Sequence, residues 1–261
     1  MASVFKGDIL TTFGIEKISQ LSKDTMFRVR KAIAAAIGVS SALVGEEVVT
    51  SQLVSRSGVY KTKFNFCGYQ LPIFLNLTND DIWGVRKACA ESIVAISNNC
   101  SRSARLDQLT PVYLELIKDV SFILWQKCLL LTIYGKTSRW VRNSTYQQLG
   151  PFIASLDGED IPPKLLEHYI GMVEGTRSQY GDSDTVKFCA FSFPGVLLTL
   201  GKEKWPTLQP IYATLTEDLQ WKVRRTLSHS LHEVAKILGT ELTETHLLST
   251  FELFLKDLDQ V

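Results

Sequence analysis

An Asp followed at a fixed distance by a Val-Arg pair recurs along the chain, and this pattern constrains the fold more than any other feature. In three copies the Asp stands five residues before the Val and six before the Arg. These copies begin at Asp24, Asp80 and Asp218, and a fourth Val-Arg pair at Val141-Arg142 lacks the Asp at that distance. A short unit repeated at intervals predicts an array of small structural repeats rather than one globular core.

Each Val-Arg pair opens a segment with the period of an α-helix. Apolar or small residues follow the Val at offsets drawn from three, four, seven and eight, which places one stripe on each helix. Small residues in these stripes, such as Ala32, Ala88 and Ser92, predict that a neighbouring helix approaches closely. We expect the Asp at the N-cap, where its carboxylate would accept hydrogen bonds from free amides of the first turn.

A second apolar segment precedes each Asp, with prolines such as Pro72, Pro111 and Pro206 near its start, as suits the first turn of a helix. The unit is therefore a helix, a short turn that begins with Asp, and a second helix. It resembles the HEAT repeat. The resemblance implies an all-α, right-handed α-solenoid of HEAT or armadillo-like helical hairpins, with residues 1–261 forming one array of roughly five to six units that is incomplete at both ends.

In HEAT repeats, the turn Asp and the second-helix Arg of successive units form a hydrogen-bonded ladder. The resemblance therefore implies structural roles for four pairs: Asp24 with Arg30, Asp80 with Arg86, Asp119 with Arg142, and Asp218 with Arg224. A weaker unit runs from Asp182 through Val186 to Lys187. Because Lys lacks the planar fork of Arg, the rung expected there is weaker.

Two segments disturb the spacing of the repeat. Val29 to Val85 and Val85 to Val141 are each 56 residues, longer than a HEAT-like unit of about 40 to 47 residues. Removal of residues 54–70 and 120–136, 17 residues each, leaves 39 in both intervals and restores the Asp spacing before Val141. We therefore interpret both segments as inserts.

Each insert begins with Val, whose codons start with GT, and ends with Gln70 or Lys136, whose codons include CAG and AAG. We interpret both as retained in-frame introns, and a structured isoform-specific loop is the alternative. The apolar run within residues 116–142 is too short for a membrane span, and Gln126-Lys127 interrupts it. Leu130 stands where a phosphate-binding loop needs its first Gly. A buried helix would put an apolar segment where a tight turn belongs.

The composition excludes several classes of function. The formal net charge is +1, and about −4 without the inserts, so no strong field favours nucleic acid or an anionic membrane. The five cysteines form no CxxC, which argues against a zinc site and a disulfide framework. With no secretion signal and no catalytic or metal-ligand pattern, we expect a non-enzymatic protein of the cytoplasm, and also the nucleus, without cofactor or metal.

Aromatic residues mark the expected turns. Trp83, Trp140 and Trp221 each precede a Val-Arg pair by one or two positions, and Arg139 and Lys222 stand beside two of them. A Trp at the start of a surface helix either packs on the adjoining turn or anchors a partner, because Trp is favoured at binding hot spots.

Longer strings resemble the family of protein phosphatase 4 regulatory subunit 1 and, more distantly, the protein phosphatase 2A scaffold subunit. They lie at residues 81–91, 138–153, 188–201, 220–227 and 254–261. The resemblance implies a non-catalytic scaffold that binds a serine/threonine protein phosphatase catalytic subunit and directs it to phosphoprotein substrates or adaptors. It also implies that turn residues contact that subunit, here Trp83, Arg139, Trp140, Trp221 and Lys222. A trafficking or nuclear-transport adaptor on the same solenoid is the alternative.

Overall fold

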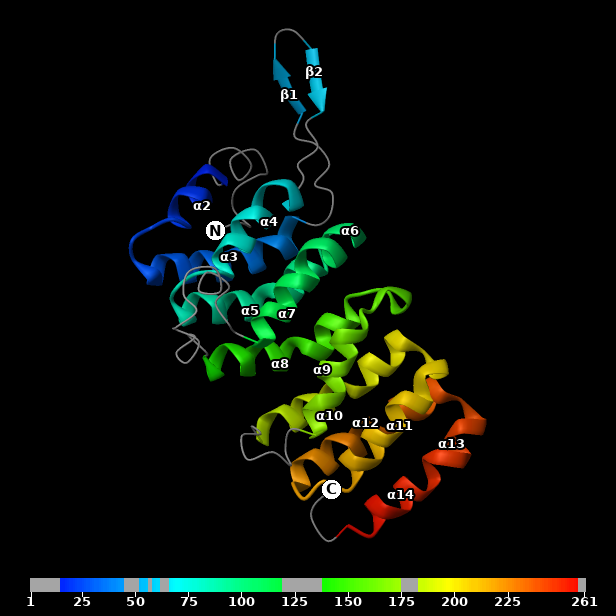
Figure 1. The fold of residues 1–261 in the computed structure, drawn as a ribbon. Helices are drawn as coiled ribbons and strands as arrows, with labels where there is room; N and C mark the ends of the chain where they lie inside the picture. Colours follow the sequence, from blue (N-terminus) through cyan, green and yellow to red (C-terminus); the bar gives the residue numbers. More distant parts are fainter. Residues whose placement is uncertain are drawn as a thin grey trace. The chain divides into compact units, whose positions relative to one another are not determined.

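The computed structural model describes residues 15–44, 52–55, 58–61, 66–118, 138–174 and 183–257. The chain divides into two compact units, Met1–Thr145 and Tyr146–Val261. Within these described ranges, both units are helical, and the first also has a two-stranded hairpin (Figure 1). The all-α class predicted from the sequence is confirmed. No helix of the described ranges has the length and apolarity needed to cross a membrane.

The first unit contains three consecutive helical hairpins, the last of which is closed by α8. Its elements are α2 (Ile15–Leu21), α3 (Phe27–Val44), β1 (Gln52–Ser55), β2 (Gly58–Lys61), α4 (Phe66–Leu77), α5 (Trp83–Ser97), α6 (Arg102–Ala104), the π-helical turn η2 (Arg105–Leu109), α7 (Thr110–Lys118) and the start of α8 (Arg139–Ala154). The strands are antiparallel, with Gln52 opposite Lys61 and Ser55 opposite Gly58.

The second unit continues from α8 in the same style. Its elements are the 3-10 turn η4 (Gly158–Asp160), α9 (Pro163–Glu174), α10 (Ser183–Leu200), the 3-10 turn η6 (Lys202–Lys204), α11 (Trp205–Thr216), α12 (Trp221–Leu238), α13 (Thr240–His246) and α14 (Leu248–Leu255). Gly201 and Gly239 follow α10 and α12 with φ of 78° and 79°. Glycine adopts this positive φ at no steric cost, so each of the two long helices ends where the sequence supplies one.

The turn Asp does not cap the helix directly. The N-cap residues of α5 and α12 are Ile82 and Gln220, and neither caps through its side chain. Instead, each Asp carboxylate accepts the amide of the residue two positions later: Asp80 accepts from Ile82 at 2.9 Å and Asp218 from Gln220 at 2.8 Å. The prediction that the Asp is the N-cap is therefore wrong, because the N-cap lies two residues later. The Asp instead closes an Asx turn that precedes the helix.

Small residues allow successive second helices to approach closely, as predicted. In the first unit α3 packs on α5, and a Cβ added at Gly38 would lie 2.6 Å from the Cβ of Ser92. Ser41 reinforces this contact by donating to the carbonyl of Ala95 at 3.0 Å. In the second unit, a Cβ at Gly150 of α8 would lie 2.1 Å from the Cβ of Ser192 in α10. Neither glycine has room for a side chain.

In the hairpin of α9 and α10, the residues that occupy the repeat's Val and Arg positions lie one residue earlier than the sequence pattern predicts. Tyr113 donates to the carbonyl of Thr145, four residues after Val141, and Tyr169 donates in the same way to Cys189. Cys189 stands four residues after Thr185. Thr185 therefore takes the place of the Val, and the buried Val186 takes the place of the Arg.

The structure describes part of one proposed insert and none of the other. Residues 120–136 lie outside the described residues. Residues 54–70 include the end of β1, all of β2 and the start of α4. Gln70, the last of them, is buried and accepts a hydrogen bond from Ser40 at 3.0 Å. The origin of both segments and the single-array organisation of residues 1–261 stay predictions.

Replacing Gly150 with alanine should lower the free energy of unfolding. Overpacking against Ser192 costs about 1–3 kcal/mol, more than the roughly 0.5–1 kcal/mol that a helix gains from Gly to Ala. Gly171→Ala in α9 is the matched control, because an added Cβ there meets nothing within 4 Å. Urea midpoints should fall for Gly150→Ala and rise for Gly171→Ala. An equal rise in both variants would show that α8 and α10 are not in close contact.

Candidate partner-binding turns

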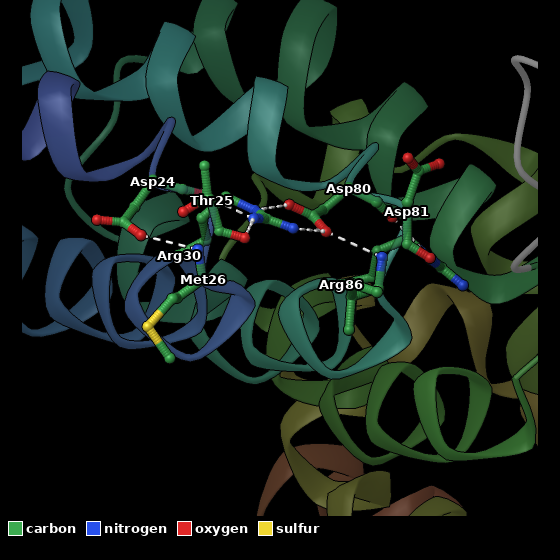
Figure 2. A network of polar contacts seen from close by, with 8 residues as sticks. Asp24, Thr25, Met26, Arg30, Asp80, Asp81 and Arg86 are labelled. Atoms are coloured by element: carbon green, nitrogen blue, oxygen red, sulfur yellow. Dashed lines mark hydrogen bonds and ion pairs between the residues drawn. The ribbon is translucent and has the colours of Figure 1, made fainter.

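Arg30 ties together two successive turns of the first unit. Its Nε and Nη2 donate to the two carboxylate oxygens of Asp80 at 2.5 and 3.0 Å, and its Nη1 donates to the main-chain carbonyl of Asp24 at 2.7 Å (Figure 2). The hydrogen bond to Asp80 is the main reason that the pKa of Arg30 is raised. A planar guanidinium suits this two-sided role because its donors form a fixed fork.

Arg224 repeats the arrangement in the second unit. Its Nε and Nη2 donate to Asp257 at 2.6 and 3.0 Å, and its Nη1 donates to the carbonyl of Asp218 at 2.8 Å. Arg86 likewise donates to the carbonyl of Asp80 at 2.7 Å. Each of these arginines therefore binds the main chain of its own turn, and Arg30 and Arg224 also bind the carboxylate of the next turn.

Two of the predicted ladder positions differ from these. Asp119 lies outside the described residues, so its pairing with Arg142 stays a prediction. Lys187 donates to Asp184 at 2.9 Å within α10, one turn of helix away. The one-residue shift of this hairpin explains the local contact, because Val186 rather than Lys187 stands at the ladder position.

The three predicted tryptophans lie at the starts of second helices and are partly exposed. Trp83 is the first residue of α5, Trp140 the second of α8, and Trp221 the first of α12. Their exposed fractions are 48%, 52% and 38%. Each of the three side chains is therefore partly covered and partly exposed to solvent.

Cationic side chains lie over the rings of Trp140 and Trp221. The guanidinium of Arg139 lies 5.0 Å from the ring centre of Trp140. Lys222 Nζ lies 5.7 Å from the ring centre of Trp221, and the guanidinium of Arg225 lies 5.9 Å from it. An exposed cation–π pair contributes about 0.5–1 kcal/mol, enough to hold the cation beside the ring.

Sequence analysis missed several exposed apolar residues at the same turns. Met26 and Phe27 are 59% and 41% exposed, Ile82 is 37% exposed and Leu219 is 97% exposed. Phe27 stands two residues before Val29, as Trp83 stands two before Val85. Its position in the repeat could therefore have identified it as a candidate from the sequence. We use the term turn ridge for the exposed apolar residues and flanking cations at these turns, within each unit separately.

The turn ridge has the residue composition that is typical of protein-binding surfaces. Interfaces are enriched in aromatic residues, Met and Arg, and Trp and Arg dominate their hot spots. Cys89 and Cys189, the two cysteines in second helices, are poorly suited to act as nucleophiles. Burial raises the pKa of the Cys189 thiol to about 12 and also raises the pKa of the Cys89 thiol. In the part of the chain that the structure describes, no cluster of His, Cys, Asp and Glu could hold a metal ion.

The repeated hairpins define a helical-repeat protein of the HEAT class, and residues 71–100 match the HEAT repeat family model. Residues 189–261 match the model of the protein phosphatase 4 regulatory subunit 1 middle domain. The chain is also similar to serine/threonine-protein phosphatase 4 regulatory subunit 1 of Homo sapiens, Mus musculus and Rattus norvegicus. Identity to each is 50% over 101 residues, 39% of this chain and 11% of the relative.

These matches confirm the predicted resemblance to this regulatory subunit, and the matched stretch spans about a tenth of the length of the relatives. Among solved structures, a Kap121p mutant is 15% identical with a TM-score of 0.63, covering 96% of this chain and 22% of that chain. An engineered protein is 15% identical with a TM-score of 0.53, covering 94% and 90%. At this identity the two structures support the solenoid type of fold alone.

Replacing Arg30 with lysine should lower the free energy of unfolding by about 1–2 kcal/mol, because lysine cannot serve both turns at once. The pair is well covered, with side-chain exposures of 18% for Arg30 and 8% for Asp80. Lys87→Gln is the control, since its exposed ion pair with Glu91 contributes within about 0.5 kcal/mol. Chemical denaturation would measure both, and equal effects would contradict a special role for the fork.

Proposed function

We propose that this chain is part of a non-catalytic regulatory scaffold that binds the catalytic subunit of a serine/threonine protein phosphatase of the phosphatase 4 type. One observation carries the proposal. The residues that match the regulatory subunit's middle domain, 189–261, include an exposed Trp221 flanked by Lys222 and Arg225 at a turn fixed by Arg224. Sequence similarity and an interface-like surface therefore coincide.

The turn ridge supplies the contacts in this proposal. In the second unit, Trp221 is the apolar anchor and Lys222 is the adjacent cation. In the first unit, Trp83, Arg139 and Trp140 have the same roles. An aromatic ring with a cation at its edge suits a partner surface where an apolar pocket has an acidic rim.

The scaffold would bring the phosphatase to phosphoprotein substrates or adaptors in the cytoplasm, and also in the nucleus. Such a role needs no cofactor and no catalytic residue of this chain. It also needs neither a membrane nor nucleic acid, in keeping with a formal net charge of +1.

The Trp221→Ala variant should weaken binding to purified phosphatase 4 catalytic subunit by at least about tenfold, the effect of losing a hot-spot side chain. Biolayer interferometry would give both dissociation constants. Phe191→Ala is the matched control, because Phe191 is a 77% exposed aromatic residue of the same unit that lies on α10 rather than on a turn. Unchanged binding by Trp221→Ala, or an equal loss with Phe191→Ala, would contradict the assignment.

Removing residues 120–136 should strengthen binding to the same catalytic subunit, because in the sequence this insert separates Asp119 from Thr137 and so breaks the spacing of the repeat. Three chains would be compared in a pull-down: the full chain, one lacking 120–136, and one lacking both 54–70 and 120–136. The second chain keeps α4 whole, so it separates the effect on the turn from the loss of residues 66–70.

Equal recovery by all three chains would make both inserts tolerated loops. Recovery by none of them, with each soluble and helical, would contradict the phosphatase proposal. Recovery of transport factors instead would favour the alternative of a trafficking or nuclear-transport adaptor.

A further inference from the structure

The bodies of α10 and α12, away from the turns, share an exposed surface in the second unit. Phe191 and Leu198 of α10 are 77% and 68% exposed. They stand seven residues apart, so they lie on one side of the helix, about 10 Å apart along its axis. Gly195 stands between them, and a Cβ added there would meet nothing within 4 Å. The helix therefore presents two apolar side chains with open space over the glycine between them.

Successive second helices stack in register, and this places a stripe of α12 beside the stripe of α10. Gly150, nine residues after the repeat Val, meets Ser192, which stands seven residues after Thr185 at the Val position of α10. In the first unit, Gly38 and Ser92 meet with the same offsets. The next pair, α10 and α12, is also in contact (Figure 1). Positions that are equivalent in the repeat therefore lie side by side on α10 and α12.

The α12 stripe is polar and cationic where the α10 stripe is apolar. His229 is the equivalent of Phe191, and Lys236 is the equivalent of Leu198. Arg225 stands four residues before His229 in the same stripe, and these three side chains of α12 are exposed. We use the term helix-pair face for these five residues of α10 and α12.

The charge at one position of the α12 stripe is not balanced within its own helix, unlike its counterpart in α5. Lys87 and Glu91 of α5, the equivalents of Arg225 and His229, form an ion pair at 2.5 Å. In α12 an imidazole stands in place of that carboxylate, and Arg225 donates to His229 at 3.4 Å. The guanidinium therefore has a polar neighbour and no carboxylate to neutralise it.

The rest of α12 adds positive charge with little to oppose it. Its sequence holds four Lys or Arg and one carboxylate, that of Glu233. Arg224 is paired with Asp257. Arg225 and Lys236 form no ion pair with any residue that the structure describes. Unpaired cations beside an exposed apolar stripe are complementary to a partner that carries carboxylates beside apolar side chains.

We propose that the helix-pair face binds an acidic amphipathic helix of a partner protein. The apolar stripe of that helix covers Phe191 and Leu198 and places a side chain in the space over Gly195, as in other complexes in which a helix lies in a groove. Carboxylates along one edge of the stripe meet Arg225 and Lys236. These two cations stand eleven residues apart, about 16 Å along α12, so the partner needs about three helical turns.

A helix fits this spacing better than an extended segment does. Apolar residues three and four apart in a helix reach the face at intervals of about 5 Å, which matches two contacts about 10 Å apart with one between them. Alternate residues of an extended segment recur at about 6–7 Å and miss this spacing. Nucleic acid suits the face poorly, because half of it is apolar.

The helix-pair face is distinct from the turn ridge, with which it shares only Arg225. The inference therefore does not rest on the phosphatase proposal. Substitutions at Phe191 and Lys236 test it alone, in experiments from which the catalytic subunit is absent.

The test selects binders without naming a partner in advance. A display library of random peptides of about 16 residues, roughly four helical turns, would be selected on the full chain. Peptides that also bind the Phe191→Ser, Lys236→Glu double variant would be removed. Both side chains are exposed, so this variant should keep its fold. We expect the remaining peptides to be enriched in Asp and Glu and to carry apolar residues three and four apart.

Synthetic copies of these peptides would then be measured by fluorescence anisotropy. Phe191→Ser should weaken binding by at least about tenfold, because an apolar anchor is lost. Lys236→Glu should weaken it by about threefold or more at low salt, and by less in high salt, because salt screens exposed charges. Changing the acidic residues of the peptide to lysine should restore binding to the Lys236→Glu variant.

Two matched controls lie outside the helix-pair face in the same unit. Leu255 is a 70% exposed residue of α14, and Lys164 is an exposed residue of α9. Leu255→Ser and Lys164→Glu repeat the same kinds of change and should alter binding by no more than about twofold.

Several results would overturn the proposal. One is that no peptide remains after the removal step, and another is that the remaining peptides are neutral or basic, or lack the helical spacing. Equal weakening by Phe191→Ser and Leu255→Ser would also contradict it. A chain that is dimeric by light scattering and becomes monomeric with Phe191→Ser would assign the face to another copy of the chain. Binding of a random-sequence oligonucleotide that Lys236→Glu weakens and Phe191→Ser does not would assign the cations to nucleic acid.

Discussion

The structure of each hairpin stack depends on one interaction, the arginine fork that holds two turns at once. Asp80 has two partners: its carboxylate accepts the amide of Ile82, which shapes its own turn, and the guanidinium of Arg30, which fixes the preceding hairpin. The contact with Arg30 forms only when both turns are in place, and the contact with Ile82 orients the carboxylate that accepts it. The interaction therefore couples local turn geometry to the stacking of neighbours, which is the coupling that gives a repeat protein its stability.

The exposed aromatic residues depend on the same coupling. Because the turn is fixed by polar contacts on its inner side, its outward residues need not pack to hold it. Trp83 and Trp221 remain partly open at the first residues of their helices, each after a turn that polar contacts hold. A side chain held in place before binding loses little conformational entropy on binding, which suits an anchor.

Much of this arrangement could be predicted from the sequence, because the repeat encodes it locally. The Val-Arg pairs place the starts of α5, α8 and α12, and the small residues predict the close approach of second helices. Contacts between residues 50 positions apart could not be predicted from the local pattern. The carboxylate that Arg30 binds is that of Asp80, because the stacking of the two hairpins brings these residues together. Val186 was misleading because it mimics the pattern, and the contact between Tyr169 and Cys189 reveals the shift. The exposure of Trp221 and its neighbours likewise depends on which faces the stacking covers.

The glycine contacts have a further consequence for the angle between neighbouring hairpins. At Gly38 and at Gly150, the second helices of successive hairpins are separated by only the hydrogen atom that glycine has as its side chain. The first helices meet through other residues, so a larger group at this position acts as a wedge on one side only. A single substitution can therefore tilt one hairpin against the next, and a repeat protein of this kind can change its curvature one residue at a time.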